Sequence, residues 1–172
     1  MHWYPAYIGL GSNLDEPALR VEQALGALRE LPGQQLISHS PFYGSRPMGP
    51  VAQPDFCNAV AAMLTQLPAL DLLRALRALE QALGRSAPRE RWGPRRIDLD
   101  LLIYGSERHA GDELTVPHPG IVQRNFVLYP LADVAADLSI PGLGRVADLL
   151  KDVSGDGLWR LDGQQLSATV HA

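Results

Sequence analysis

The chain has 172 residues, of which 46% are hydrophobic and 20% are charged, and its formal net charge is −4. This length suits one ordinary domain, and this composition excludes a chain that is mainly disordered. No apolar run approaches the roughly 20 residues of a membrane span, and the first residues lack the pattern of a secretory signal. The single cysteine, Cys57, excludes a disulfide framework within the chain and an all-cysteine zinc site. We therefore expect one cytoplasmic domain over residues 1–172, with no membrane partner.

The predicted elements alternate between strands and helices along the first two thirds of the chain. Short apolar runs indicate strands, whereas leucines spaced by about 3.6 residues indicate helices. Asp15 is the expected N-cap of the first helix, and Gly84 the expected end of the second. In chain order we expect a strand over 6–10, a turn over 11–13, a helix over 19–31, a strand over 36–43, an irregular segment over 44–54, a strand over 56–64, a helix over 68–83, a loop over 85–96 and a strand over 97–104.

This order, β-α-β-β-α-β, predicts an α+β fold. It is typical of a ferredoxin-like core, in which helices pack on one face of a mainly antiparallel sheet. Extra elements are expected after this core: a helix over 121–132 and a C-terminal extension over about 138–172, with a short amphipathic segment over 146–151. The two irregular segments, 44–54 and 85–96, are long for so small a fold, and loops of that length usually carry function.

Two aspartates lie two residues apart in the last predicted strand. Because strand side chains alternate, Asp98 and Asp100 project from one face while Leu99 and Leu101 project from the other. The two carboxylates repel each other and resist burial, and a divalent cation would relieve both problems. Mg²⁺ prefers such carboxylates together with the phosphates of a substrate. The alternative is that both aspartates face water or pair with nearby arginines.

A cluster of arginines leads directly into this strand. It holds one acid, Glu90, and five arginines: Arg85, Arg89, Arg91, Arg95 and Arg96. The planar guanidinium group suits bidentate contacts to phosphate, so the cluster beside the aspartates favours a site for a nucleotide triphosphate. Trp92 could close over a ring of the ligand. The alternative is a solvated basic loop in which Trp92 packs on the core.

His118 lies between two prolines, and Arg124 follows six residues later. Both side chains could reach a phosphate, although a histidine in this setting is more often a capping or surface residue. Phe56 and Phe126 are most simply core residues when read alone. Asn58, inside a predicted strand, is most simply a hydrogen-bonded structural group.

Four separated blocks of sequence carry a resemblance to a known family. They are YIGLGSNL at 7–14, PMGP at 47–50 with QPDFCNA at 53–59, RWGPR at 91–95 with IDLD at 97–100, and LTVPHP at 114–119 with Arg124 and Phe126. With these blocks the chain resembles the 6-hydroxymethyl-7,8-dihydropterin pyrophosphokinases of folate biosynthesis, over about residues 7–134. The resemblance implies a role for each matching position.

The implied roles fall into three groups. Asp98 and Asp100 resemble the pair that binds two Mg²⁺ ions on the phosphates of ATP, and with Arg95 and Trp92 they are the candidate catalytic residues. The candidate ATP-binding residues are Arg85, His118, Arg124, Thr115, Leu73, Glu80 and Leu101. The candidate pterin-binding residues are Ser45, Met48, Phe56, Asn58, Phe126 and Gly9.

The resemblance implies transfer of diphosphate from ATP to 6-hydroxymethyl-7,8-dihydropterin, which yields AMP and the pterin diphosphate. It also implies a monomer or weak homodimer with small-molecule partners. One alternative is a small RNA-binding ferredoxin-like module, because such sheets often bind RNA and this chain has a basic loop with a tryptophan. The net charge of −4 and the lack of an aromatic strand motif argue against nucleic acid. Another alternative is a catalytically idle structural subunit.

Overall fold

A computed structural model describes residues 2–84 and 96–162 of the chain as an α+β fold. The helices in this part are α1 (Pro17–Glu30), α2 (Ala69–Ala82), α3 (Asn125–Ala135) and α4 (Val146–Leu150), with a 3-10 turn at Ile121–Gln123. The strands are β1 (Tyr4–Ser12), β2 (Gln34–His39), β3 (Tyr43–Ser45), β4 (Phe56–Thr65), β5 (Asp98–Tyr104), β6 (His109–Ala110), β7 (Thr115–Val116), β8 (Ser139–Ile140), β9 (Gly144–Arg145) and β10 (Leu158–Arg160).

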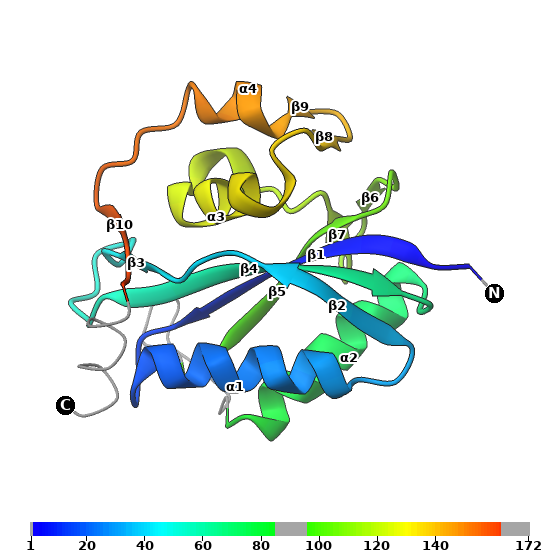
Figure 1. The fold of residues 1–172 in the computed structure, drawn as a ribbon, viewed down its shortest axis with the longest axis horizontal. Helices are drawn as coiled ribbons and strands as arrows, with labels where there is room; N and C mark the ends of the chain where they lie inside the picture. Colours follow the sequence, from blue (N-terminus) through cyan, green and yellow to red (C-terminus); the bar gives the residue numbers. More distant parts are fainter. Residues whose placement is uncertain (1, 85–95, 163–172) are drawn as a thin grey trace.

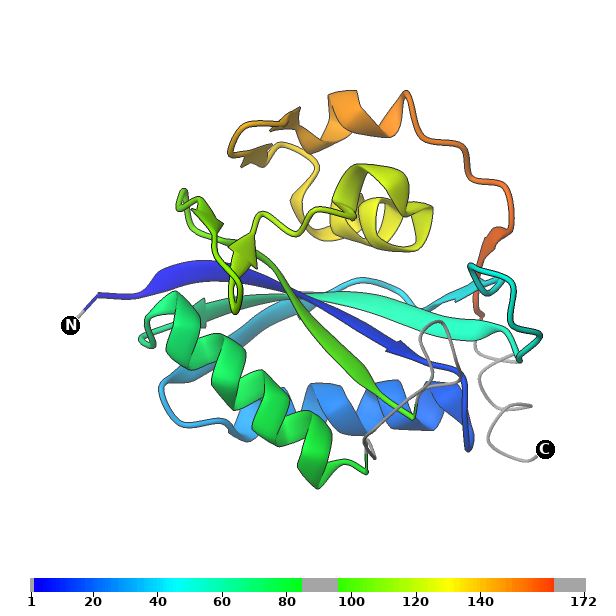
Figure 2. The ribbon, with the colours of Figure 1, turned by 180° about the vertical axis from the view of Figure 1, so that it is seen from behind.

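The main sheet has six strands in the order β10-β3-β4-β1-β5, with β2 also paired to β4, and its pairings are antiparallel. Helices α1 and α2 lie on one face of this sheet, whereas α3 covers the other and α4 lies over α3 (Figures 1 and 2). The two helices of the expected core, α1 and α2, thus share one face, and the additional helix α3 lies on the other. No helix in the described part of the chain combines the length and apolar character needed to cross a membrane.

A hydrophobic core lies between the sheet and the helices α1 and α2. Along β1 the residues Ala6, Ile8 and Leu10 point into it, since every second side chain of a strand faces the same way. Leu99 and Leu101 of β5 join them. Burial of each large side chain stabilises the fold by about 1.5–3 kcal/mol. The helices contribute the buried residues Val21, Leu25, Leu28, Leu72, Leu73 and Leu76.

A second apolar cluster fills part of the opposite face, between the sheet and α3. Val60 of β4 and Leu102 of β5 contact this cluster from the sheet. The remaining buried members come mostly from the last third of the described chain: Ile103, Ile121, Val127, Leu128, Leu131, Ile140 and Val146. The cluster stops short of the end of the sheet where β3 and the start of β5 lie, and that end is where the candidate site is found.

The strand expected over 36–43 is two strands in the structure, β2 and β3. Pro41 lacks an N–H and interrupts the ladder. Ser40 bridges the break, because its N–H donates to the carbonyl of Val60 at 2.8 Å and its Oγ accepts from the N–H of Val60 at 2.9 Å. The segment expected to be irregular from 44 onward therefore begins inside a strand.

The first strand is longer than expected. Gly11 and Ser12, predicted to turn, belong to β1 because this central strand has a partner on each side. Asp15 is not the N-cap of α1: that position is Glu16, whose φ is 63° and whose side chain caps no N–H. The Asp15 carboxylate instead forms an ion pair with Arg96 at 2.7 Å.

The helix expected over 121–132 begins later and ends later. Residues Ile121–Gln123 form a 3-10 turn, and Arg124 has extended backbone with φ −123° and ψ 101°. The α-helix therefore starts at Asn125 and continues to Ala135. This boundary places Arg124 and Phe126 at the very start of α3, close to the end of the sheet.

The last described part of the chain returns to the sheet. We term residues 153–161 the C-terminal strap: it leaves α4, runs beside α3 and reaches β3, where it supplies β10 (Figure 1). The short amphipathic segment expected over 146–151 folds as α4 over Val146–Leu150. The strap itself was not among the expected elements.

Candidate active site

A cavity of about 330 Å³ opens at the end of the sheet, on the face covered by α3. Its floor comes from β1, β4 and β5, one wall comes from β3 and the residues after it, and another comes from the start of α3. The lining residues are Gly9, Leu10, Gly11, Ser45, Arg46, Met48, Gln53, Phe56, Asn58, Ala59, Asp98, Asp100, Arg124, Phe126 and Val127.

Two glycines of β1 keep the floor of this cavity open. Gly9 lies opposite Asp100, and Gly11 lies opposite both Asn58 and Asp98. A Cβ at Gly11 would stand 3.2 Å from the Oδ1 atom of Asn58, which is tighter than ordinary van der Waals contact. Glycine is therefore needed here for space rather than for an unusual backbone angle.

Asp98 and Asp100 project from β5 into the cavity, as their spacing predicts. Both are half-buried, whereas Leu99 and Leu101 are buried in the core on the other face. Within residues 2–84 and 96–162, no three His, Cys, Asp or Glu side chains gather as a metal cluster. Two carboxylates beside an open, glycine-floored cavity still fit Mg²⁺, which takes one or two carboxylates and completes its shell with phosphates and water.

Glu80 braces the aspartate strand from the opposite face. It is 1% exposed, and its carboxylate accepts hydrogen bonds from the N–H of Leu99 and from Arg77, both at 2.9 Å. Arg77 also donates to the carbonyl of Leu99 at 3.1 Å. The backbone between the two aspartates is thus fixed by a helix side chain, although Glu80 is not among the residues that line either cavity described here.

A smaller cavity of about 170 Å³ lies on the other side of Asp100. Two leucines, Leu73 and Leu101, give it apolar walls. Its full lining is Leu73, Arg77, Asp100, Leu101, Glu113, Leu114, Thr115, His118 and Pro119. Asp100 therefore lines both cavities and lies at their shared boundary.

His118 lines the smaller cavity and carries a neutral N–H donor. Its Nδ1 atom accepts a hydrogen bond from the N–H of Gly120 at 3.0 Å, which assigns the proton of the neutral ring to Nε2. Burial lowers the pKa of His118; Asp100 acts in the opposite direction, and Arg124 and Arg77 add to the lowering. The ring is accordingly a hydrogen-bond donor near neutral pH rather than a cation.

The wall of the larger cavity carries polar and aromatic groups in fixed positions. Asn58 is buried, and its Nδ2 atom donates to the Oγ of Ser45 at 2.7 Å, so the amide is held in one orientation. Phe56 on β4 and Phe126 on α3 are half-buried and line the cavity from different elements. Met48 is 40% exposed at its rim.

The structure brings together most of the residues that the sequence singled out. The six candidate pterin-binding residues, with Asp98, Asp100 and Arg124, line the larger cavity. Leu73, Leu101, Thr115 and His118 line the smaller one. Arg85, Trp92 and Arg95 lie outside the described residues.

Sequence reasoning missed several lining residues, above all Gly11, Gln53 and Arg77. Gln53 accepts a hydrogen bond from Asn13 at 2.8 Å and so links the first two sequence blocks. Arg77 lies four residues after Leu73 and three before Glu80, so helical spacing places all three on one face of α2. That spacing was the available signal for Arg77.

Comparisons with known proteins agree with this geometry. The profile of the 7,8-dihydro-6-hydroxymethylpterin-pyrophosphokinase family matches residues 7–136. A Pseudomonas aeruginosa protein named 2-amino-4-hydroxy-6-hydroxymethyldihydropteridine pyrophosphokinase is 46% identical over 91% of this chain and 96% of its own length. A Haemophilus influenzae protein of the same name is 41% identical over 91% of this chain and 98% of its own.

A solved structure of Plasmodium falciparum HPPK-DHPS with pterin and p-hydroxybenzoate shares the fold. It superposes with a TM-score of 0.70 over 93% of this chain at 15% sequence identity, and the chain spans 45% of that longer protein. With the profile covering most of the chain and close relatives covering nearly all of it, the protein belongs to the 7,8-dihydro-6-hydroxymethylpterin-pyrophosphokinase family.

Proposed function

We propose that the two cavities form one active site in which 6-hydroxymethyl-7,8-dihydropterin and ATP meet at Asp100. Membership of the family makes the chain a 2-amino-4-hydroxy-6-hydroxymethyldihydropteridine pyrophosphokinase, an ATP-dependent diphosphotransferase of folate biosynthesis. The hydroxymethyl oxygen attacks the β-phosphorus of ATP, the diphosphate moves as a unit and AMP leaves. The observation that carries the assignment is that Asp100 lines both cavities.

The larger cavity suits the pterin. Phe56 and Phe126 offer aromatic faces to a flat heterocyclic ring, which favours stacked or edge contacts. The amide of Asn58, held by Ser45, offers a hydrogen bond to the polar edge of that ring. Gly9 leaves room for the ring to approach the backbone, and Met48 closes the rim.

The smaller cavity suits the nucleoside of ATP. Leu73 and Leu101 give apolar contact to the base, and Thr115 supplies a hydroxyl at the edge. His118 directs its Nε2 proton toward the phosphates without adding a positive charge. Arg124 supplies positive charge from the larger cavity. Arg85 and Arg95, also proposed for the phosphates, and the candidate catalytic residue Trp92 rest on the sequence resemblance alone.

Asp98 and Asp100 are the proposed ligands of two Mg²⁺ ions. Their support is the pair of hard oxygen donors facing an open floor, with no bulky side chain at Gly9 or Gly11. Bound Mg²⁺ would neutralise the charge on the phosphates. The chain's own contribution is to hold the two carboxylates at one place, through the brace of Glu80 on Leu99.

Asp98 and Asp100 are proposed to act as metal ligands and not as an acid/base pair for the hydroxymethyl group. The Nδ1 atom of His118 is occupied by the N–H of Gly120. Catalysis is therefore proposed to rest on positioning and on charge neutralisation, which suffice in phosphoryl-type transfer. The attacking oxygen and the phosphorus are brought together because the two ligands share the Asp100 boundary.

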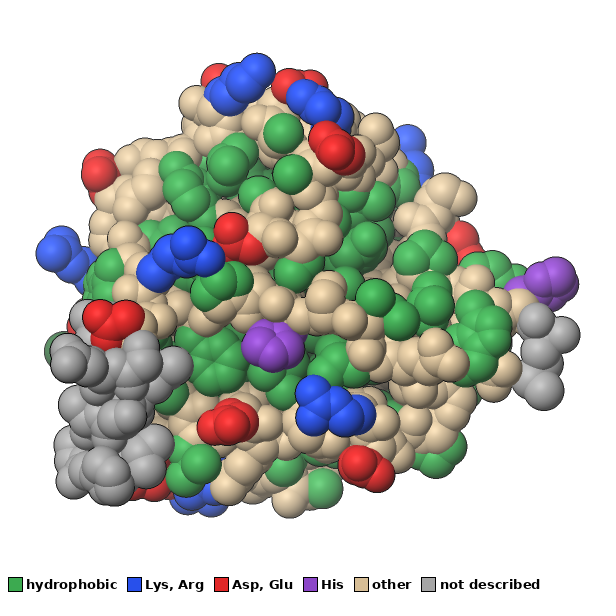
Figure 3. Space-filling view, viewed as in Figure 1, with side chains coloured by type: hydrophobic (Ala, Val, Ile, Leu, Met, Phe, Trp, Pro, Cys, Tyr) green, Lys and Arg blue, Asp and Glu red, His purple; other side chains and the backbone are tan. Residues whose placement is uncertain are grey.

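The proposed framework of this site is a ferredoxin-like core with a C-terminal extension, folded as one domain. The strand order β3-β4-β1-β5, its antiparallel pairings and the placement of α1 and α2 on one face support this. The RNA-binding alternative receives no support from the relatives. In the view of Figure 3, described side chains of both charges are scattered over the visible surface, without a broad basic area.

The test is the appearance of AMP. Purified protein is mixed with ATP, Mg²⁺ and 6-hydroxymethyl-7,8-dihydropterin, and controls omit the pterin or the metal. AMP in step with pterin diphosphate, and only when all three are present, is the expected result. ADP in place of AMP would refute diphosphate transfer. Absence of turnover in protein that binds both ligands would favour an idle subunit.

A further inference from the structure

We propose that the C-terminal strap is a positioning element for the pterin cavity, and that Asn125 is the residue through which it acts. The proposal rests on the proposed function and deepens it. It concerns what holds two walls of one cavity at a set spacing: the start of α3, which carries Arg124 and Phe126, and β3, which carries Ser45.

At the start of α3 the strap is held by Asn125, which lies between two cavity residues. The Nδ2 atom of Asn125 donates to the carbonyls of Ser154 and Asp156, both at 2.9 Å. An amide NH₂ has two hydrogen atoms, so both are used on the strap. Because Arg124 and Phe126 are the immediate neighbours of Asn125 and line the cavity, this contact fixes the part of the helix that faces the ligand.

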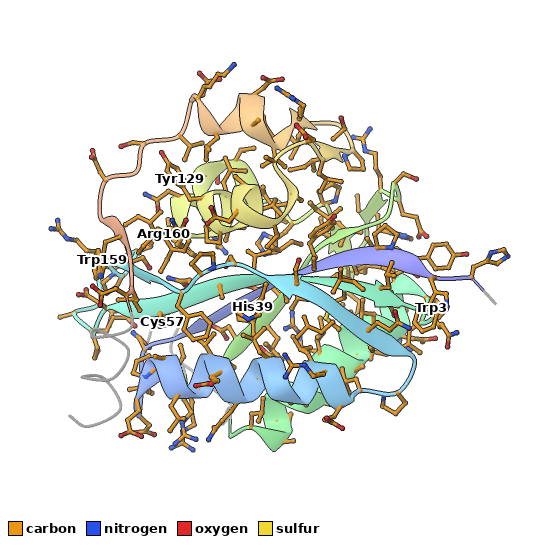
Figure 4. The ribbon with its side chains drawn as sticks, in the orientation of Figure 1. Trp3, His39, Cys57, Tyr129, Trp159 and Arg160 are labelled. Atoms are coloured by element: carbon orange, nitrogen blue, oxygen red, sulfur yellow. The ribbon has the colours of Figure 1, made fainter. Side chains whose placement is uncertain are left out.

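At β3 the same strap is bound as a strand. Leu158 lies opposite Ser45, and the N–H of Arg46 donates to the carbonyl of Gly157 at 3.0 Å. The indole of Trp159 lies so close over Gly44 that a Cβ there would stand 2.3 Å from it. Figure 4 shows Trp159 and Arg160 on β10, at the end of the strap. The strap therefore touches the backbone on both sides of Ser45.

The rest of α3 is held by other contacts, so the loss of Asn125 acts on one end. Tyr43 of β3 donates a hydrogen bond to Asp133, about two helical turns after Asn125. Tyr129 donates to the carbonyl of Val153 at 2.8 Å, one turn after Asn125. With these contacts in place, removal of the Asn125 donors frees the first turn of α3, while its later turns stay fixed.

The experiment compares Asn125→Ala and Asn125→Asp with Tyr129→Phe. The aspartate has the size of asparagine and favours a helix start, but it donates to neither carbonyl. Tyr129→Phe is the matched control, since it removes one contact between the strap and α3 away from the cavity residues. The readouts are binding of the pterin in the presence of a non-hydrolysable ATP analogue and Mg²⁺, KM for each substrate, kcat, and the melting temperature.

Both Asn125 variants are expected to weaken pterin binding and raise the pterin KM by about tenfold, or about 1.4 kcal/mol. KM for ATP and kcat stay within about twofold, and Tyr129→Phe leaves all ligand readouts at the wild-type level. Asn125→Asp should weaken the pterin as much as Asn125→Ala even where it melts no lower, which a role in stability alone does not explain. Wild-type pterin affinity in both Asn125 variants would overturn the proposal. A wild-type protein that neither binds the pterin nor forms AMP would overturn the proposed function instead.

Discussion

The two faces of the main sheet are built from the same strands and do different work. Under α1 and α2 the inward positions are mostly apolar, as Ile8 of β1 and Leu99 of β5 illustrate, and Glu80 is a buried exception. On the face of α3, alternate positions of those strands carry Gly9, Asp98 and Asp100, and the cover is incomplete where the cavity opens. Because side chains alternate along a strand, one short segment supplies apolar residues to the core on one face and site residues to the cavity on the other.

From this difference we expect stability and chemistry to depend on different, neighbouring residues. Leu99 and Asp100 are adjacent in β5 and point to opposite faces. Substitution of Leu99 should lower the free energy of unfolding and leave the turnover of folded molecules unchanged. Substitution of Asp100 should lower turnover and leave the free energy of unfolding unchanged. The predictions that follow test this separation, beginning with the largest effect.

Asp100→Asn is expected to lower kcat/KM by about a thousandfold, which corresponds to about 4 kcal/mol of transition-state stabilisation. The amide keeps the volume but removes the charge from the position that both cavities share. Initial rates of AMP formation measure the effect, and thermal unfolding serves as the control. A variant that retains a tenth of wild-type turnover would contradict the central place of Asp100.

Leu99→Ala is the counterpart on the other face. Its side chain is 0% exposed, and truncation is expected to destabilise the fold by about 2–5 kcal/mol through lost burial and the cavity left behind. Denaturant unfolding measures this loss. Turnover per folded molecule should remain within a few-fold of wild type below the melting temperature. A specific activity as low as that of Asp100→Asn would show that the faces are not independent.

Gly11→Ala is expected to weaken pterin binding by about tenfold, since its Cβ would press on Asn58 from 3.2 Å. The matched control is Gly26→Ala in α1, where nothing lies within 4 Å of the added Cβ. The control should stabilise the protein by about 0.5–1 kcal/mol and leave binding unchanged. Titration calorimetry and thermal unfolding distinguish the two. Equal pterin affinity in both variants would remove the steric role assigned to Gly11.

Tyr43 allows the α3 face to be tested by pH. Burial and the hydrogen bond to Asp133 raise the pKa of Tyr43 from 10.0 to about 12. The unfolded chain therefore loses this proton first, so the contribution of Tyr43 to stability is present below pH 10 and falls as pH rises toward 12. Tyr43→Phe should reduce the pH dependence of the free energy of unfolding between pH 10 and pH 12. An unchanged slope in the variant would argue against the Tyr43 contact.

Cys57 gives the smallest expected signal. Burial in the α1 and α2 core raises the pKa of its thiol to about 12, and the residue is 3% exposed. A thiol reagent at pH 8 should therefore leave the native protein unlabelled over the time in which the denatured chain is fully labelled. Mass spectrometry measures the label. Rapid labelling of the native protein would show that the hydrophobic core around Cys57 readily becomes accessible to solvent.

How far the sequence predicts this molecule depends on how local the cause is. The aspartate strand, α2 and the grouping of the site residues follow from period and from the resemblance, because each signal lies within a short segment. The break at Pro41 was missed because the ladder is continued by the hydroxyl of Ser40 bonding to Val60, a contact between distant positions. The face on which α3 packs likewise depends on tertiary contacts that no spacing in the sequence records.

The strap shows the same limit more sharply. Leu158–Arg160 is too short to read as a strand by alternation, and its partner β3 was itself assigned to the end of another element. The family resemblance pointed to Arg124 and Phe126 but not to Asn125, and no pattern in the sequence marked Asn125 as important. Only the folded chain places the Asn125 amide against the carbonyls of Ser154 and Asp156.

The pairing of β10 with β3 bears on how the protein is made. Strands β1 and β4, the centre of the sheet, leave the ribosome more than ninety residues before Leu158, about 5–20 s earlier at ordinary speeds of synthesis. The helices α1 and α2 also precede Leu158, so the hydrophobic core beneath them can assemble on a nascent chain. The sheet edge beside Ser45 is completed only by β10, the last described strand. A chain that ends before β10 would therefore form the hydrophobic core but lack the strand that holds this wall of the proposed site.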